Sequence, residues 1–156
     1  MTFAEPCDGG AHATTRLAAA ALLAVMRRGD RVLDAGCGDG FLARLARDAG
    51  ARVTALDIDP AAVGMSLPGV EGIRGDAAQI DRTFDVVVAN LPDAELRRCL
   101  PSLVAAAGRV LVVTGGRLVQ ASAIRRALAG LVATASSLDG WYCLSVVRGR
   151  ASFAAA

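Results

Sequence analysis

Two short, uninterrupted apolar runs constrain the fold of this chain most strongly. Val86-Val-Val-Ala89 and Val110-Leu-Val-Val113 contain no polar residue to place on a solvent-facing side. A strand that is apolar on both faces must be covered on both faces, which is typical of a parallel sheet between two layers of helices. Helical stretches separate the short runs, as connections between parallel strands require. The pattern predicts an α/β fold with a mostly parallel sheet and helices on both faces.

Apolar periodicity, together with the glycine and proline residues that interrupt it, places the individual elements. Seven strands are expected, at 31–35, 52–56, 70–74, 84–89, 109–113, 132–138 and 141–148. Helices are expected at 15–28, 41–49, 94–106 and 119–129, with a short one opening at Pro60. The last two strands flank Asp139-Gly140, a dipeptide that favours a tight hairpin, so the C-terminal hairpin should bring one antiparallel strand into the sheet.

The length of 156 residues fits a single domain. We expect a core at 16–149, an N-terminal arm at 1–15 that lies over the ligand site, and a flexible tail at 150–156. The longest near-apolar run, 17–26, is too short to span a membrane and has no basic segment before it, so a soluble, cytoplasmic protein is expected. This apolar segment can be buried against the sheet or in a homodimer.

The charged and metal-binding residues exclude several kinds of chemistry. All 17 basic residues are arginine, so no lysine is present for Schiff-base catalysis or for a phosphate-binding loop of the nucleoside triphosphatase kind. The net charge of +2, without a long basic stripe, leaves nucleic-acid binding unsupported. Four scattered cysteines and a single histidine predict neither a metal site nor a disulfide framework.

The first strand runs into Asp34-Ala-Gly36-Cys37-Gly38-Asp-Gly40, with glycines at alternate positions immediately before a helix. Glycine is required where the backbone turns with positive φ or approaches a ligand closely. A tight turn alone would account for one or two of these glycines. A dinucleotide-binding fingerprint would need glycine where the chain has Phe41. The loop therefore predicts a ligand site that differs from a dinucleotide site.

This D-x-G-x-G-x-G loop resembles motif I of the class I S-adenosylmethionine-dependent methyltransferases, which have a Rossmann-like fold. The similarity continues at Asp57, which ends the second strand, and at Gly75-Asp76-Ala77 after the third. The resemblance implies that Asp34 orients the methionine ammonium group, that Asp57 accepts the ribose hydroxyls, and that Asp76 and the backbone of Ala77 bind adenine. The other cofactor-binding residues that it implies are Thr14, Thr15, Gly36, Cys37, Gly38, Gly40, Ile58 and Asn90.

Asn90-Leu91-Pro92-Asp93, at the end of the fourth strand, resembles the Asn-Pro-Pro-aromatic motif of amine and amide methyltransferases. The PrmA-type protein-lysine methyltransferases are more similar, since they carry Asn-Ile or Asn-Leu at this point without the aromatic residue. The segments 10–15 and 139–142 also resemble PrmA segments, and the resemblance covers residues 3–149. It implies that Asn90 and the Leu91 carbonyl hold the acceptor nitrogen. Asp93, by its position, is a candidate to accept the proton that the acceptor amine must lose.

The resemblance thus implies a methyltransferase that acts on a protein or peptide amine, although the N-terminal substrate-binding domain of PrmA has no counterpart in this sequence. Two alternatives stay open: a small-molecule O- or N-methyltransferase of a biosynthetic pathway, and a non-catalytic partner subunit that has kept the fold. His12 could act as a base, but a structural role near the cofactor is favoured. The expected partners are S-adenosyl-L-methionine and a methyl acceptor, without a membrane.

Overall fold

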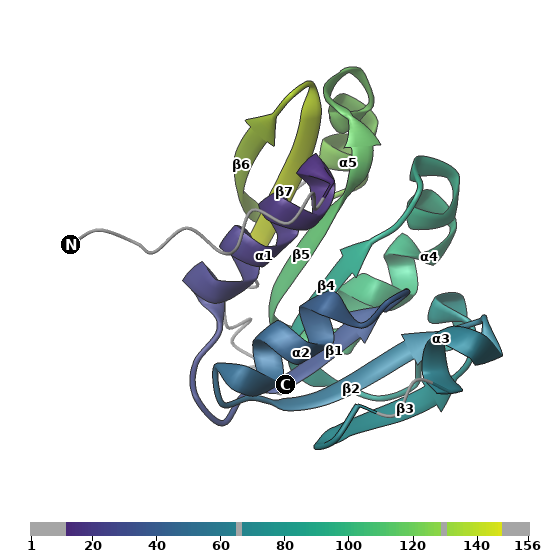
Figure 1. Ribbon diagram of the computed structural model, residues 1–156. Helices are drawn as coiled ribbons and strands as arrows, with labels where there is room; N and C mark the ends of the chain where they lie inside the picture. The colour runs from purple at the N-terminus through teal and green to yellow at the C-terminus, as the bar shows by residue number, and fades with distance from the viewer. Residues whose placement is uncertain (1–11, 65–66, 129–130, 148–156) are drawn as a thin grey trace, which may run out of the picture.

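The computed structural model describes residues 12–64, 67–128 and 131–147. Its seven-stranded sheet has the order β3-β2-β1-β4-β5-β7-β6 (Figure 1). The strands are β1 (Arg31–Ala35), β2 (Arg52–Asp57), β3 (Val70–Arg74), β4 (Phe84–Asn90), β5 (Ala107–Arg117), β6 (Val132–Leu138) and β7 (Trp141–Val147). The helices are α1 (Ala13–Val25), α2 (Phe41–Asp48), α3 (Pro60–Gly64), α4 (Asp93–Ala106) and α5 (Ala121–Ala127), with 3₁₀ turns η1 (Ala77–Gln79) and η2 (Leu118–Gln120).

The strand directions confirm the predicted fold class. Strands β1 to β5 pair in parallel with their neighbours, and β7 runs antiparallel between β5 and β6. At the hairpin between β6 and β7, Asp139 and Gly140 have φ angles of 52° and 78°. Positive φ at both central residues is the geometry that matches a tight turn to the twist of the two strands. The aspartate–glycine signal therefore predicts this hairpin correctly.

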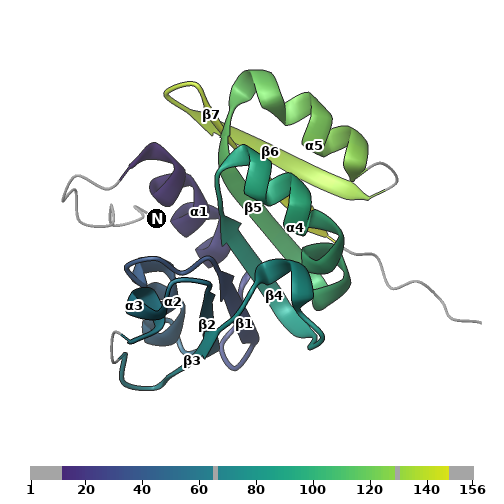
Figure 2. The same cartoon turned by 90° about the vertical axis from the view of Figure 1, so that its right-hand side faces the viewer.

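The two-sided burial predicted for the fourth strand is also confirmed. Val86 and Val88 belong to the core that β4 shares with α1 and α2, whereas Val87 and Ala89 belong to the core shared with α4 and α5. Figure 2 shows the sheet between these two helical layers. All three valines are fully buried, and each contributes roughly 1.5 kcal/mol or more through the apolar surface removed from water.

Several element boundaries differ from the prediction. Helix α1 begins at Ala13 because the Nδ1 atom of His12 accepts a hydrogen bond from the backbone N–H of Thr14, and it ends at Val25 because Met26 is extended. The helix predicted at 119–129 is divided into η2 and the shorter α5. Strand β5 is longer than predicted, since its last residue, Arg117, still pairs with Trp141 of β7.

Some predictions for the chain ends fall outside the described residues, namely 1–11 of the arm and the tail at 150–156. Residues 13–15, predicted as the end of the arm, form the first turn of α1 instead. The apolar face of α1 packs against α2 and against strands β4, β5 and β7, so the sheet covers it, while dimerisation stays a prediction. Among the helices that the structure describes, none is long and apolar enough to cross a membrane.

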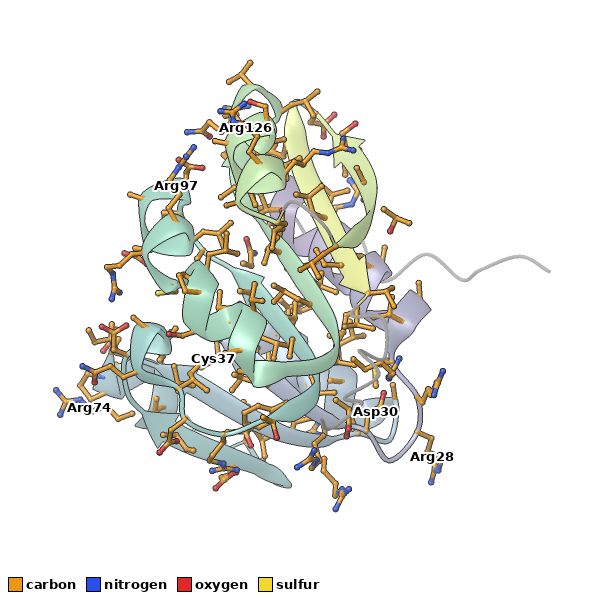
Figure 3. The ribbon with its side chains drawn as sticks, turned by 180° about the vertical axis from the view of Figure 1, so that it is seen from behind. Arg28, Asp30, Cys37, Arg74, Arg97 and Arg126 are labelled. Carbon is orange, nitrogen blue, oxygen red and sulfur yellow. The ribbon has the colours of Figure 1, made fainter. Side chains whose placement is uncertain are left out.

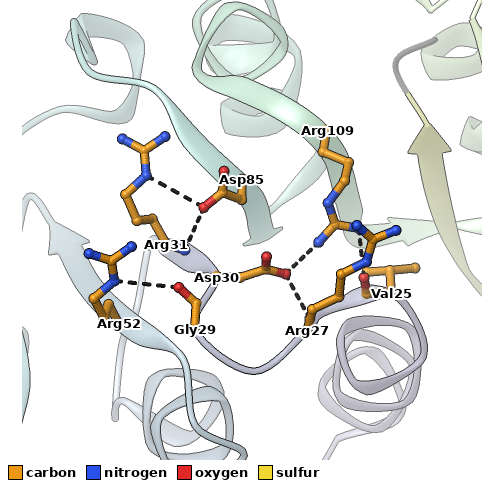
Figure 4. Close-up of polar contacts among 8 residues, drawn as sticks. All are labelled: Val25, Arg27, Gly29, Asp30, Arg31, Arg52, Asp85 and Arg109. Carbon is orange, nitrogen blue, oxygen red and sulfur yellow. Dashed lines mark hydrogen bonds and ion pairs between the residues drawn. The ribbon is translucent and has the colours of Figure 1, made fainter. Parts of the chain in front are cut away.

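Polar contacts join the α1–β1 turn to the start of β5 at the amino ends of the strands (Figure 4). Asp30 accepts a hydrogen bond of 2.7 Å from the backbone N–H of Arg27 and forms an ion pair with Arg109. Arg109 also donates to the backbone carbonyl of Val25 at 2.9 Å. Both charged side chains of the ion pair are partly buried, with 12% and 26% exposure, so this pair is screened less than the exposed pairs.

We expect Asp30→Ala to lower the free energy of unfolding by about 1–3 kcal/mol, because it leaves a partly buried guanidinium and a backbone N–H without their acceptor. Urea denaturation at neutral pH measures this loss. Asp48→Ala is the matched control, because Asp48 is 66% exposed in its pair with Arg47 and should contribute little. Equal losses for the two variants would contradict the role given to Asp30.

Candidate active site

The turn between β1 and α2 exposes backbone at the carboxyl end of the sheet. Gly36, Gly38 and Gly40 have φ angles of 76°, 50° and 73°. A Cβ atom on Gly36 would lie 2.3 Å from the side chain of Leu91, whereas one on Gly38 would meet nothing within 4 Å. At position 36 the positive φ favours glycine, and a Cβ there would also displace the Leu91 side chain; at position 38 glycine leaves open space over the backbone. A ligand can approach the chain closely at Gly38.

The same turn is fixed to the end of β2 by backbone contacts. The carbonyl oxygen of Leu56 accepts hydrogen bonds from the N–H groups of Gly36 and Cys37, at 2.8 and 3.1 Å. The Cys37 side chain is buried, and burial raises the pKa of its thiol to about 12, with the charges of Asp34 and Asp57 adding to the shift. The thiol therefore stays protonated at neutral pH, as expected for a small apolar filler rather than a nucleophile.

Asp57 places a carboxylate beside this turn. Its Oδ2 atom accepts the N–H of Gly38 at 2.9 Å, and its Oδ1 atom accepts the N–H of Asp59 at 2.9 Å. Each carboxylate oxygen can accept about two hydrogen bonds, so within the described residues both keep a free lone pair. Two neighbouring hydroxyl groups, as on a ribose, match these acceptors. The next side chain, Ile58, is 67% exposed.

Asp34, two residues before the glycine turn, has a buried carboxyl group. It is 1% exposed, and neither oxygen accepts a hydrogen bond of normal geometry within the described residues, although the backbone N–H of Ala43 is close enough to favour the ionised form. Burial raises the pKa of this group from its ordinary value of 3.8 to about 7; the backbone N–H of Ala43 opposes the shift, and the charges of Asp39 and Asp57 add to it. Buried carboxyl groups without a partner are uncommon. A cationic group of a ligand that reached Asp34 would provide a partner for its carboxylate.

Asp76 follows β3 and caps η1. Its Oδ1 atom accepts the backbone N–H of Ala78 at 2.9 Å, and both of its oxygens contact the Nη1 atom of Arg98 on α4, at 3.0 and 2.7 Å. The guanidinium of Arg98 holds the pKa of Asp76 below its ordinary value, and the bond from Ala78 acts in the same direction. Ala77, which the family resemblance assigns to adenine, is buried at the start of η1.

The end of β4 carries the predicted acceptor-binding segment. The Nδ2 atom of Asn90 donates to the Oγ1 atom of Thr15 at 3.3 Å, which joins this strand to the first turn of α1. The N–H of Leu91 donates to the carbonyl of Thr114 on β5 at 3.1 Å. The Leu91 carbonyl oxygen lies so close to Gly115 that a Cβ there would be 1.9 Å away. Glycine at position 115 therefore lets this segment lie against β5.

Asp93 is the first residue of α4 and pairs with Arg97 on the same helix. Its Oδ2 atom accepts a hydrogen bond of 2.7 Å from Arg97, and its Oδ1 atom is buried without a partner within the described residues. The hydroxyl of Tyr142 is likewise buried and unpaired there, and its pKa is raised to about 12 by burial and then by the Asp93 charge. Arg97 projects outward at this end of the molecule (Figure 3).

A cleft of about 210 Å³ brings together predicted residues from four loops. Those that line it are Gly36, Asp57, Ile58, Asp76, Ala77, Asn90 and Leu91. The predicted residues that do not line it are Thr14, Thr15, Asp34, Cys37, Gly38, Gly40 and Asp93. Parallel α/β folds bind ligands at this edge, beyond the carboxyl ends of the strands.

Five cleft residues are not among the predicted site residues: Gly75 and Pro92, which lie within the quoted motifs, and Glu95, Arg98 and Cys99 on α4. The three α4 residues belong to no motif. Their spacing places them on one face of the helix, but the sequence does not show that this face borders the cleft.

A larger hollow, about 700 Å³, lies at the opposite end of the sheet. Its lining mixes charges that pair with one another, as Arg82 does with Glu71 at 3.0 Å. Within the described ranges, no group of three or more His, Cys, Asp or Glu side chains is arranged to hold a metal ion. None of the described residues that line the hollow has a buried polar side-chain atom without a hydrogen-bond partner, as Asp34 has. We therefore place the site at the carboxyl edge.

His12 lies at that edge in a stack of three side chains. Its ring contacts Trp141 edge to face, with centroids 4.7 Å apart, and the guanidinium of Arg117 lies 4.1 Å from the Trp141 centroid. His12 also caps α1, and its Nδ1 atom is 3.0 Å from the hydroxyl of Thr14. These contacts give His12 a structural role between α1 and the hairpin, as the sequence favours.

The fold is that of the class I S-adenosylmethionine-dependent methyltransferases. Among solved structures with this fold is the magnesium protoporphyrin IX methyltransferase of Synechocystis PCC 6803 with bound SAM, which has 21% identity and a TM-score of 0.66 over 87% of this chain and 78% of that chain. Within the class, the chain belongs to the family described as ribosomal protein L11 methyltransferase (PrmA), whose model matches residues 8–149.

Two relatives show how far the family similarity extends. The ribosomal protein L11 methyltransferase of Burkholderia mallei (strain NCTC 10229) is 37% identical over 151 residues, covering 89% of this chain and 50% of that protein. The crystal structure of ribosomal protein L11 methylase from Lactobacillus delbrueckii subsp. bulgaricus has 26% identity and a TM-score of 0.82, covering 90% of this chain and 81% of that chain. The chain spans about half the length of the curated relatives it matches.

We expect Asp34→Asn to change how stability depends on pH. In the unfolded chain this carboxyl group loses its proton near pH 4, whereas the folded chain keeps the proton up to about pH 7. The folded state thus binds more protons across this window, so the wild type loses up to about 4 kcal/mol of stability from this group as pH rises through it. Asparagine cannot ionise, so the variant avoids this loss. The free energy of unfolding of Asp34→Asn, minus that of the wild type, should therefore be larger at pH 8 than at pH 5.

Urea denaturation of both proteins at the two pH values measures this difference. Asp48→Asn, at an exposed position, should show the same effect at pH 5 as at pH 8. If Asp34→Asn behaved like this control, Asp34 would already be ionised in the folded protein at pH 5.

Proposed function

We propose that this chain binds S-adenosylmethionine at the carboxyl edge of the sheet and transfers its methyl group to an amine nitrogen of a protein. One observation carries the proposal. Asp76, Asp57, Asp34 and Asn90 come from the ends of β3, β2, β1 and β4, which are consecutive in the sheet. This is the order of adenine, ribose, methionine and acceptor expected from the family resemblance. The four strand ends lie side by side in Figure 1.

The residues present fit this cofactor. Within the described residues, Asp57 keeps free acceptor positions on both oxygens for a ribose diol, Gly38 leaves space above the backbone, and Asp34 has no cationic partner. An ammonium group beside Asp34 would favour its ionised form, so binding should release a proton near neutral pH. The cofactor supplies a methyl group that its sulfonium already activates.

The protein then has to hold the acceptor nitrogen in line with that methyl group and to exclude water. Asn90 is suited to this, because its Nδ2 atom is fixed by Thr15 while its Oδ1 atom makes no hydrogen bond within the described residues. This oxygen can accept an N–H from the acceptor amine and orient the nitrogen lone pair. The backbone carbonyl of Leu91 is the second proposed contact.

For the acceptor we propose a protein amine, with ribosomal protein L11 as the first candidate, since that protein is named for the relatives with 37% and 26% identity. A cytoplasmic location follows from such a substrate and is part of the proposal. The alternative small-molecule acceptor gains no support from the described cleft, whose acceptor end carries no aromatic platform among its lining residues.

Calorimetry with S-adenosylhomocysteine tests the cofactor, and intact mass after incubation with S-adenosylmethionine and ribosomal protein L11 tests the transfer. We expect binding, and a mass gain of one or more methyl groups on the protein. Asp57→Asn should weaken binding at least tenfold, because it removes the charge and one acceptor from the diol site. Binding without methylation of L11 or of a panel of peptide and small-molecule amines would favour a non-catalytic subunit. No binding would overturn the proposal.

We further propose that Asp93 accepts the amine proton, since its Oδ1 atom has no partner within the described residues. Asp93→Asn should then lower kcat/KM by about a hundredfold and flatten its rise with pH. Affinity for S-adenosylhomocysteine should not change, because Asp93 does not line the cleft. Unchanged turnover with an unchanged pH profile would show that Asp93 only pairs with Arg97.

A further inference from the structure

Arg98 reaches the cleft from α4 and contacts a residue 22 positions earlier in the chain. Its Nη1 atom lies 3.0 Å from Oδ1 and 2.7 Å from Oδ2 of Asp76. Both side chains line the same cleft as Ala77. Glu95, one helical turn before Arg98, also lines this cleft. The pKa of Arg98 is raised mainly by its hydrogen bond to Asp76, then by Cys99, and to a smaller extent by the charge of Glu95. The guanidinium thus pairs with the Asp76 carboxylate at the edge of the cleft.

The hydrogen bonds to Asp76 leave its two oxygens unequal. Oδ1 accepts from the N–H of Ala78 and from Arg98, which fills its two acceptor positions. Oδ2 accepts only from Arg98 within the described residues and keeps one position free. The carboxylate is therefore held from two sides by η1 and α4, with a single acceptor left for a further donor.

Exposed ion pairs contribute little to stability, and Arg98 is 52% exposed, so fold stability does not account for this contact. The ion pair of Arg82 with Glu71 is a useful comparison, because it is exposed in the same way but has no place in the cleft. The distance between Arg82 Nη2 and Glu71 Oε2 is 3.0 Å, and neither side chain lines the cleft. At the cleft, the consequence of the pair is to fix the orientation of a carboxylate that faces the ligand.

We propose that Arg98 is a positioning residue that sets the base selectivity of this site, by holding Asp76 so that its one free acceptor selects a purine with an exocyclic amino group. The inference rests on the proposed cofactor. An amino group donates an N–H to the free position on Oδ2. A purine with a carbonyl group at the same place brings a second acceptor against the carboxylate, so that both are left unpaired and repel each other.

Isothermal titration calorimetry with S-adenosylhomocysteine and S-inosylhomocysteine measures this selectivity. The wild type should bind the adenine compound at least tenfold more tightly. Arg98→Gln should weaken adenine binding roughly three- to tenfold and leave hypoxanthine binding nearly unchanged, so that the selectivity ratio falls. Arg98→Lys should restore part of the ratio because it keeps a cation at this place. Arg82→Gln is the matched control and should bind both compounds like the wild type.

A double-mutant cycle tests whether Arg98 acts through Asp76. In the Asp76→Asn background, Arg98→Gln should have no further effect on the selectivity ratio. Arg98 holds the pKa of Asp76 low, so its loss lets this carboxyl group take up a proton at higher pH. In the wild-type background, the pH below which the protein stops binding S-adenosylhomocysteine should therefore be higher for Arg98→Gln.

Three results would overturn the inference while leaving the proposed cofactor intact: wild-type selectivity in Arg98→Gln, additive effects of the two substitutions, or tighter adenine binding in Arg98→Gln. The last result would mean that Arg98 obstructs the cleft. A wild type that binds neither compound would contradict the proposed function itself.

Discussion

The backbone carbonyl of Leu56 is the contact on which the cleft depends. It accepts N–H groups from Gly36 and Cys37, so the turn that leaves β1 is fixed to the end of β2. Gly38 is then in reach of Asp57, at 2.9 Å. This arrangement exists only in one strand register, because a shift by one residue would exchange the side chains that face the two helical layers. Core packing and ligand geometry thus depend on the same alignment.

Features that arise from short-range patterns can be predicted from this sequence. The valine-rich run of β4 and the Asp139-Gly140 turn follow from burial and from backbone conformation, each over a few residues. The cap formed by His12 is harder to foresee, because histidine is not among the preferred capping residues. Arg98 could not be predicted at all. Its contact with Asp76 depends on how α4 packs beside η1, and no local pattern specifies that packing.

Charge is distributed unevenly along the carboxyl edge. Of the three carboxyl groups that end β1, β2 and the β3 loop, only Asp76 has a cationic partner within the described residues, and Asp34 is buried without one. Such an arrangement disfavours folding on its own, because burial and mutual repulsion both oppose ionisation. Under the proposed function, the ammonium and sulfonium groups of the ligand provide the opposite charge. Binding of such a ligand would then offset the cost of burying Asp34.

Helix α4 has a role at both ends of the cleft. It begins three residues after Asn90, and Arg98 and Cys99 line the cleft one turn further along, while Leu96 and Leu103 anchor it in the core. A packed helix moves as one body, so its two contacts cannot be adjusted separately. Under the proposed function, grafting a different helix here to admit a new acceptor would therefore also alter the choice of nucleobase. A redesign of this chain through α4 would then change both specificities together.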